Sequence, residues 1–287
     1  MALRFAKMHG LGNNYIYLDL TQAGAGELDL PALARRVSDV NFGLGSDGLI
    51  AILPGRSGHF TMRMFNADGS EAEMCGNGIR CVGKYVYDHG LTRETRLTID
   101  TGAGPKALEL EVAHGRVRSV RVDMGPPRLA RHEIPMAGEP AERVVDEPLA
   151  VDGERFLITA VSMGNPHCVI FCDEPTDRLV REIGPRIEHH PSFPRRTNVE
   201  FVKVMPDGSL TMRVWERGSG ETMACGTGAC AVGVAAALKG LVRGGVTVHL
   251  RGGDLRIDWD GAGPVYMTGP AVEVATGTFT EEWLAAV

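Results

Sequence analysis

The sequence lacks a long apolar run, an excess of positive charge and an apolar leader. Its longest clean apolar stretch, Ala229–Leu238, is far shorter than the roughly 18 residues that a membrane-spanning helix needs. The opening residues MALRFAKMHGLGNN have no apolar core of the kind found in secretory signals. Thirty lysines and arginines against 36 aspartates and glutamates give a net charge of −6, which argues against a general attraction to nucleic acid or anionic membranes. We therefore expect a cytoplasmic protein with no nucleic-acid or membrane partner.

The cysteines lack the spacing of a zinc site. An even number of them permits a disulfide framework, but such frameworks belong to small secreted domains, and 287 residues is not small. We expect no bound metal, and we expect each cysteine to be either a buried apolar residue or a reactive thiol. No C-x₂-C pair occurs among the six, which are Cys75, Cys81, Cys168, Cys172, Cys225 and Cys230.

The chain contains an internal repeat. Gly69–Gly83 reads GSEAEMCGNGIRCVG and Gly218–Gly233 reads GSGETMACGTGACAVG, so each half has a Cys-Gly-x-Gly that opens a helical segment. Most other segments alternate apolar and polar residues, as half-buried antiparallel strands do. These features predict an α/β fold of the α+β type, with two similar domains related by pseudo-two-fold symmetry. Each domain is expected to be a mostly antiparallel sheet wrapped around one central helix.

The proline-rich segment Pro126–Pro148 shows little periodicity and divides the chain near its middle. We expect an N-terminal domain of residues 1–123 together with 272–287, carrying Cys75. We expect a C-terminal domain of residues 124–271, carrying Cys225. The two long helices are predicted at Gly78–Asp88 and Gly228–Lys239, and a further helix is predicted at Arg178–His190.

A cysteine at the start of each central helix indicates acid–base chemistry. A helix N-terminus carries partial positive charge and outward N–H groups, which lower the pKa of a thiol and bind a carboxylate. Two such ends facing one another would hold a carboxylate with one sulfur on each side. That arrangement suits removal of a proton from one face of a carbon and its return to the other face. The pattern therefore predicts racemisation or epimerisation beside a carboxylate.

The sequence has only five lysines, none of them in an obvious phosphate-binding context. Many amino-acid racemases use pyridoxal phosphate bound through a lysine as an electron sink. We therefore expect a reaction without a cofactor, in which a desolvated thiolate acts on a substrate held by helix dipoles in a closed site.

The chain resembles the diaminopimelate epimerase family over nearly its whole length. The resemblance implies an isomerase that interconverts LL- and meso-diaminopimelate with two cysteines and no cofactor, in the supply of lysine and peptidoglycan precursors. It also implies a homodimer. The stretches that carry the resemblance, in order, are KMHGLGNNY (Lys7–Tyr15), FNADGSEAEMCGNGIRC (Phe65–Cys81), GNPHCVIF (Gly164–Phe171), RTNVEFV (Arg196–Val202) and WERGSGETMACGTGAC (Trp215–Cys230).

Carried over by position, the resemblance implies that Cys75 and Cys225 are the two acid/base residues and that His167 and Glu216 tune them. Glu216 and Arg217 would read the distal amino-acid end of the substrate, since a guanidinium suits a carboxylate and a carboxylate suits an ammonium group. The other implied substrate-binding residues are Asn13, Asn66, Gly76, Asn77, Asn165, Asn198, Gly226 and Thr227. The remaining four cysteines are expected to pack in the interior.

The sequence departs from the family pattern in two places. Many members have Gln where this chain has Gly48, so a side-chain contact to substrate is absent or is made by backbone or water. The usual Gly-Asn-Asp-Phe reads Gly-Asn-Asn-Tyr here, so Asn14 lacks the charge of an aspartate. Neither change touches the cysteines.

Two alternatives stay open at this point. MCGNG and ACGTG alone would also suit a proline or hydroxyproline racemase of the same fold, whose one-ended substrate has less need of Arg217. A non-catalytic protein, in which the cysteines pair for redox sensing or bind a metal, belongs to a different class. Proton exchange at the substrate α-carbon separates all three.

Overall fold

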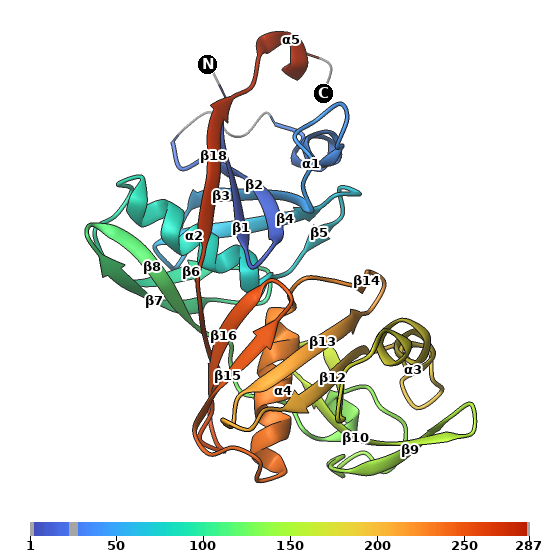
Figure 1. Ribbon diagram of the computed structural model, residues 1–287. Coiled ribbons are helices and arrows are strands. Elements are labelled where there is room, and N and C mark those ends of the chain that lie inside the picture. Colours follow the sequence, from blue (N-terminus) through green and yellow to red (C-terminus); the bar gives the residue numbers. More distant parts are fainter. Residues whose placement is uncertain (1–2, 23–27, 286–287) are drawn as a thin grey trace. The chain divides into compact units, whose positions relative to one another are not determined.

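Each half of the chain folds into strands that surround one long helix (Figure 1). The computed structural model describes residues 3–22 and 28–285. Unit 1 consists of the described residues of Met1–Val122 and Gly269–Val287, and unit 2 of Asp123–Thr268. Within the described ranges, no helix is both long and apolar enough to cross a membrane.

Unit 1 holds the long helix α2 (Gly76–Asp88) against a sheet in the order β18–β1–β2–β3–β4–β6–β7–β8. The β2–β3 and β4–β6 pairs are parallel and the other pairs are antiparallel. The strands are β1 (Arg4–Gly10), β2 (Asn13–Asp19), β3 (Gly48–Pro54), β4 (Phe60–Asn66), β5 (Glu71–Ala72), β6 (Arg96–Asp100), β7 (Lys106–Ala113), β8 (Arg116–Asp123) and β18 (Val272–Thr278), with helices α1 (Leu30–Ser38) and α5 (Glu281–Leu284).

Unit 2 repeats this topology around α4 (Gly226–Leu238), in the order β9–β10–β11–β12–β13–β15–β16–β17. The parallel pairs, β11–β12 and β13–β15, stand at the equivalent positions. The strands are β9 (Glu147–Val151), β10 (Glu154–Ser162), β11 (Pro166–Phe171), β12 (Asn198–Val204), β13 (Leu210–Glu216), β14 (Gly220–Glu221), β15 (Gly245–Leu250), β16 (Gly253–Asp258) and β17 (Tyr266–Gly269), with the short helix α3 (Gly184–Glu188). The predicted fold class, two similar mostly antiparallel α+β units, is confirmed.

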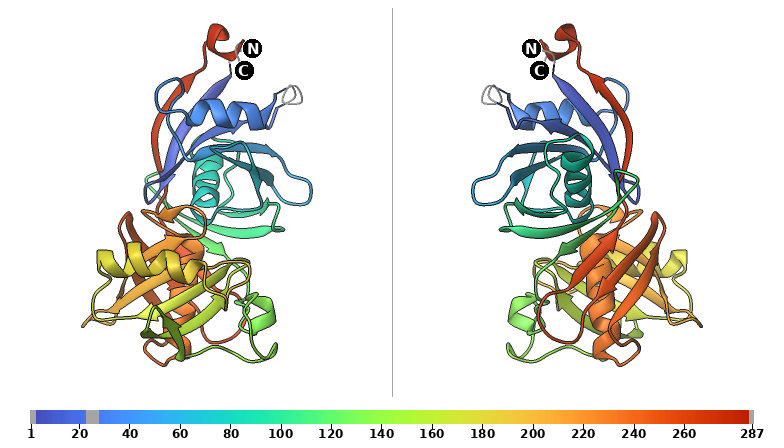
Figure 2. Two further views of the ribbon diagram at one scale, coloured as in Figure 1. Left: turned by 90° about the vertical axis from the view of Figure 1, so that its right-hand side faces the viewer. Right: turned by 90° about the vertical axis from the view of Figure 1, so that its left-hand side faces the viewer.

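Helices α2 and α4 each lie against the sheet of their own unit (Figure 2). Small residues on both helices allow this close approach. A Cβ on Gly83 would lie 2.9 Å from a methyl of Leu108, and one on Gly233 would lie 2.7 Å from a methyl of Ile257. These two glycines occupy the same place in the two repeats, eight residues after Cys75 and Cys225. Because each helix packs so closely against its sheet, only glycine fits at these two positions without displacing a neighbour.

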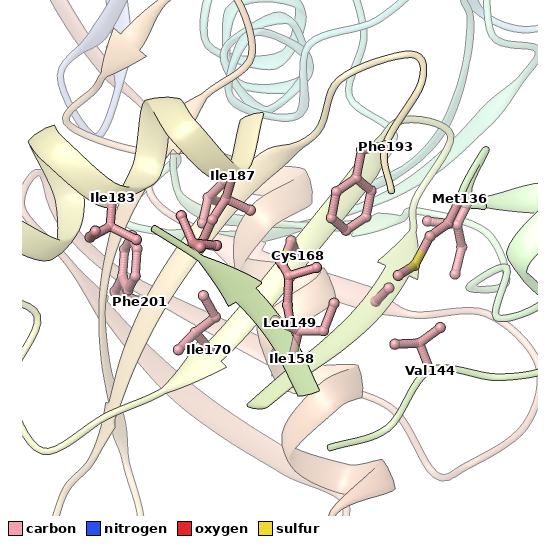
Figure 3. Close-up of a cluster of buried hydrophobic side chains, with 14 of the residues drawn as sticks. Met136, Val144, Leu149, Ile158, Cys168, Ile170, Ile183, Ile187, Phe193 and Phe201 are labelled. Atoms are coloured by element: carbon pink, nitrogen blue, oxygen red, sulfur yellow. The ribbon is translucent and has the colours of Figure 1, made fainter. Parts of the chain in front are cut away.

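An apolar cluster of unit 2 lies between β9–β12 and α3 (Figure 3). Cys168 is fully buried in it and Cys172 packs at its margin. Cys81 and Cys230 are also fully buried in their helices. The predicted packing role of these four cysteines is confirmed.

One predicted helix differs from the structure in its type. Arg178–His190 is not one α-helix, because a wide π turn at Leu179–Ile183 precedes α3. Pro185, which has no N–H to donate, stands at the start of α3 and interrupts the α-helical hydrogen bonding there. The segment Pro126–Pro148 contains the short helix Arg131–Glu133 and runs into β9.

Candidate active site

Cys75 caps the N-terminus of α2. Its backbone is extended and its Sγ accepts a hydrogen bond from the Gly78 N–H at 3.3 Å. The thiol also donates to Asn13 Oδ1 at 3.3 Å, and Asn77 Nδ2 reaches the same oxygen at 3.5 Å. The β1–β2 turn and the start of α2 thereby bring three of the predicted residues together.

Asp47, which sequence reasoning missed, orients this group. Its Oδ2 accepts hydrogen bonds from Asn13 Nδ2 at 2.9 Å and from the Asn14 backbone N–H at 2.7 Å. Because a carboxylate engages the amide nitrogen of Asn13, its Oδ1 is left facing Cys75. The signal in the sequence is the aspartate in GSDG, directly before the departure at Gly48.

Gly48 has a steric reason for lacking a side chain. Its φ is +155°, and a Cβ there would lie 2.0 Å from the Phe65 carbonyl oxygen and 2.9 Å from the Tyr15 ring. The residue opposite Gly48 in the sheet is Asn66, whose Nδ2 donates to Ser70 Oγ at 3.0 Å. The Asn66 amide therefore supports the turn after β4.

Cys225 caps α4 in the same way. Its Sγ accepts from the Gly228 N–H at 3.4 Å and lies 3.5 Å from Thr227 Oγ1. The thiol also forms a hydrogen bond with the carboxylate of Glu216, which in turn accepts a hydrogen bond from the Thr222 hydroxyl. The end of β13 and the start of α4 thus bring the Glu216 carboxylate within hydrogen-bond distance of the Cys225 sulfur.

The expectation that the helix N-terminus lowers the pKa of Cys225 is wrong. Burial raises that pKa well above its ordinary value, and the charges of Glu216 and Glu200 raise it further. The hydrogen bonds from Thr227 and from the Gly228 N–H act in the opposite direction and do not compensate. Desolvation of a thiolate beside two carboxylates outweighs a helix dipole worth about 0.3–1 kcal/mol, so Cys225 is a thiol here.

Glu216 also has a raised pKa. Burial of its carboxylate is the main cause, and the hydrogen bonds from Thr222 and Cys225 and the charge of His167 work against it. The thiol and the carboxyl group therefore share a site in which neither ionises as easily as in water.

His167 joins a buried carboxylate that sequence reasoning also missed. Its Nδ1 lies 2.7 Å from Glu200 Oε1, and both side chains are fully buried. Its Nε2 lies 3.1 Å from Asn165 Oδ1, and Asn165 Nδ2 donates to Thr227 Oγ1 at 3.3 Å. The signal for Glu200 is a single acidic residue inside the apolar strand NVEFV.

Asn198 connects β12 to the turn that carries Arg217. Its Oδ1 accepts from the Arg217 backbone N–H at 2.9 Å and its Nδ2 donates to the Pro166 carbonyl at 2.8 Å. The guanidinium of Arg217 is exposed and donates to the Arg195 carbonyl at 3.2 Å. Asn198 thus fixes the backbone of Arg217, whose remaining guanidinium donors face outward.

The four predicted amide donors occupy the first two positions of their helices. Gly76 and Asn77 begin α2, and Gly226 and Thr227 begin α4. The N–H groups of a first helical turn point along the axis toward its N-terminal end, where they favour an anion. Each unit therefore presents a sulfur beside an anion-binding helix end. Among the described residues, no group of three histidine, cysteine or acidic side chains has the arrangement of a metal site.

Comparisons with known structures agree on the fold. A hydroxyproline epimerase from Agrobacterium vitis has a TM-score of 0.69 at 17% identity, covering 96% of this chain and 92% of that one. A PhzF-family phenazine biosynthesis protein from Bacillus anthracis has a TM-score of 0.69 at 16% identity, with 98% and 99% covered. At these identities the likeness concerns the fold alone.

Sequence comparisons are far more specific. A relative from Pelotomaculum thermopropionicum named diaminopimelate epimerase is 54% identical, covering 96% of this chain and 99% of its own length. One from Moorella thermoacetica with the same name is 55% identical, again over 96% and 99%. The family profile described as diaminopimelate epimerase matches residues 5–130 and 159–274, which include both cysteine caps. The chain belongs to the diaminopimelate epimerase family.

Proposed function

We propose that the protein is a pyridoxal-independent isomerase that interconverts LL-diaminopimelate and meso-diaminopimelate. The observation that carries this proposal is the repeated cap: in each of two topologically equivalent units, the central helix begins at a cysteine, Cys75 or Cys225. Relatives more than half identical over nearly the whole chain bear the name of this activity.

The reaction needs one base and one acid on opposite faces of the α-carbon. One cysteine, as a thiolate, removes the α-proton, and the S–H of the other protonates the carbanion on the opposite face. One C–H bond breaks and one forms, and the proton lost from one sulfur is balanced by the proton gained on the other. The thiol state of Cys225 suits the acid in one direction, and the roles exchange in the reverse direction.

Glu216 supplies a route for the proton of Cys225. Its carboxylate already accepts the thiol hydrogen bond, and its raised pKa brings it closer to that of a thiol. When Cys225 must act as the base, transfer of its proton toward Glu216 leaves the thiolate that the reaction requires. On unit 1, Asn13 holds the Cys75 thiol by the hydrogen bond from Sγ to Oδ1.

Substrate recognition divides between the helix ends and Arg217. The first amides of α2 and α4, from Gly76, Asn77, Gly226 and Thr227, hold the reacting carboxylate, where negative charge grows as the proton leaves. Arg217 binds the distal carboxylate through its outward donors, and Glu216 lies beside it for the distal ammonium. The remaining pocket residues are Asn66, Asn165 and Asn198.

We further place the enzyme in lysine and peptidoglycan precursor supply, in the cytoplasm, as a homodimer. The first follows from the nature of diaminopimelate, and the other two from the family resemblance. Sedimentation equilibrium over a range of protein concentrations tests the dimer: a single species of the monomer mass contradicts it.

Isotope exchange tests the activity directly. The protein is incubated with LL-diaminopimelate in heavy water, and α-deuterium and the LL-to-meso ratio are measured by mass spectrometry and chiral chromatography. We expect deuterium in the product with wild type and no epimerisation with Cys75→Ala or Cys225→Ala. Exchange with L-proline instead would favour the racemase alternative. Exchange with neither substrate in reducing buffer would contradict both enzymatic functions.

A further inference from the structure

A fully buried carboxylate lies behind the cysteine cap of unit 2. Glu200 is on β12 and His167 is on the parallel neighbour β11, with neither side chain exposed to solvent. Glu200 Oε1 contacts His167 Nδ1 at 2.7 Å, whereas Oε2 is buried without a hydrogen-bond partner among the described residues. A buried carboxylate is costly unless it meets a cation, and the His167 ring is the basic group that it contacts.

The carboxylate of Glu200 lies close to the first turn of α4. A Cβ on Gly228 would lie 2.8 Å from Glu200 Oε1, so a side chain at this position would have to displace the carboxylate. The N–H of the same Gly228 donates to Cys225 Sγ. The carboxylate is therefore packed against the turn that carries the reactive sulfur.

The second nitrogen of His167 also faces an acceptor. Asn165 Nδ2 donates to Thr227 Oγ1, and this amide orientation directs Asn165 Oδ1 at His167 Nε2, 3.1 Å away. A neutral imidazole has one N–H and would leave one of these acceptors facing a lone pair. With the Asn165 amide in this orientation, a doubly protonated ring donates to both Glu200 and Asn165.

We propose that Glu200 is a positioning residue that, together with Asn165, holds His167 as an imidazolium next to the Cys225–Glu216 pair. The role is part of the proposed epimerase mechanism and rests on that function. Glu200 and Glu216 interact with His167, and the thiols of Cys225 and Cys168 lie within range of the Glu200 charge. In this set the imidazolium is the cation that offsets two buried carboxylates and stabilises a thiolate on Cys225 when it forms.

Direct action of Glu200 on the sulfur would have the opposite sign. The negative charge of Glu200 by itself raises the pKa of Cys225 and so opposes a thiolate. If Glu200 acted by charge alone, Glu200→Gln would ease ionisation of Cys225. If it acts by holding the imidazolium, Glu200→Gln removes the nearby cation and the thiolate becomes harder to form. The two explanations predict opposite changes.

Nitrogen NMR of the histidine rings tests the charge state without any substrate. The His167 signals are assigned by their loss in His167→Gln, and exposed His189 serves as the reference. In wild type at neutral pH we expect both His167 ring nitrogens to carry a proton, one directed at Glu200 and one at Asn165. In Glu200→Gln in the same buffer we expect only one of the two ring nitrogens to carry a proton. A neutral His167 ring in the wild-type protein at neutral pH would overturn the proposal, whether or not the protein is an epimerase.

Kinetics then test the consequence. Glu200→Gln should slow LL-diaminopimelate turnover by about 10²-fold at neutral pH, the scale of one acid–base contribution, with part of the loss recovered at lower pH. Glu200→Asp should restore part of the neutral-pH rate. Glu174→Gln, the same change at an exposed residue paired with Lys203, is the control and should leave the rate unchanged. A Glu200→Gln enzyme slowed equally at every pH would show a merely structural role and overturn the proposal.

Discussion

At the scale of single residues, the charge of Glu216 controls how readily the Cys225 thiol ionises. The carboxylate raises the pKa of this buried thiol, second only to burial itself. In Glu216→Gln the opposing charge is gone, so the pKa of Cys225 should fall while remaining above its ordinary value because burial persists. The test is the pH dependence of iodoacetamide labelling of Cys225, followed by peptide mapping. The midpoint should move to lower pH in Glu216→Gln and stay in place in Glu174→Gln. A midpoint at higher pH would rule out this electrostatic coupling.

Arg217 should not tolerate lysine. The substitution keeps the positive charge but loses the planar fork that grips a carboxylate by two parallel hydrogen bonds. We expect kcat/KM for LL-diaminopimelate to fall by roughly tenfold to a hundredfold, which corresponds to about 1–3 kcal/mol for one charged hydrogen bond. Arg243→Lys, at an exposed position of the same unit, is the matched control. Unchanged kinetics in Arg217→Lys would remove this residue from distal-end recognition.

At the scale of elements, α4 depends on glycine where it meets its sheet. A side chain at Gly233 would overlap Ile257 and press on Val246, so Gly233→Val should cost about 1–3 kcal/mol of unfolding free energy through overpacking. Urea denaturation followed by tryptophan fluorescence and circular dichroism measures the change. Ala237→Val places the same β-branched side chain on a half-buried position of α4 and should cost less. A loss in Gly233→Val no larger than that in Ala237→Val would show that close packing against Ile257 does not require glycine at 233.

The helices, the repeat and the cysteine caps can be predicted from the sequence because each is a local pattern. Cys-Gly-x-Gly followed by an apolar run specifies where α2 and α4 begin. The roles of Glu200 and Asp47 do not follow from local pattern, since each acts through a partner more than 30 residues away in the chain. The raised pKa of Cys225 likewise arises from tertiary burial, which overrides the helix field that the sequence suggests.

At the scale of the whole molecule, the returning C-terminal segment closes unit 1. β18 did not stand out in the sequence because Val272–Thr278 is mostly exposed and contains a glycine, yet it forms the edge of the sheet beside β1. The pairing joins the two ends of the chain, so it depends on residues more than 260 positions apart, such as Arg4 and Thr278. Such a contact cannot be predicted from a local sequence pattern and is found only in the folded structure.

This segment also reaches the helix that carries Cys75. The Pro270 carbonyl accepts from the buried Arg80 Nε at 3.1 Å, and Arg80 Nη1 in turn donates to the Gly76 carbonyl at 3.2 Å, one residue after the cysteine. Further along, Phe279 packs on Phe5 with ring centroids 4.7 Å apart. The first turn of α2 is thus attached to the last strand through one arginine.

Removing residues 270–287 should therefore destabilise unit 1 and leave the core of unit 2 folded. The deletion takes away β18 and leaves β1 as an unpaired edge. Hydrogen–deuterium exchange should show lost protection in β1 and at the start of α2, with β10–β12 still protected. Trp283→Ala, which removes packing at α5 but keeps β18, is the control and should leave α2 protected. Equal loss of protection in both units would show that they unfold as one body, and full protection in β1 would show that β18 contributes nothing to its stability.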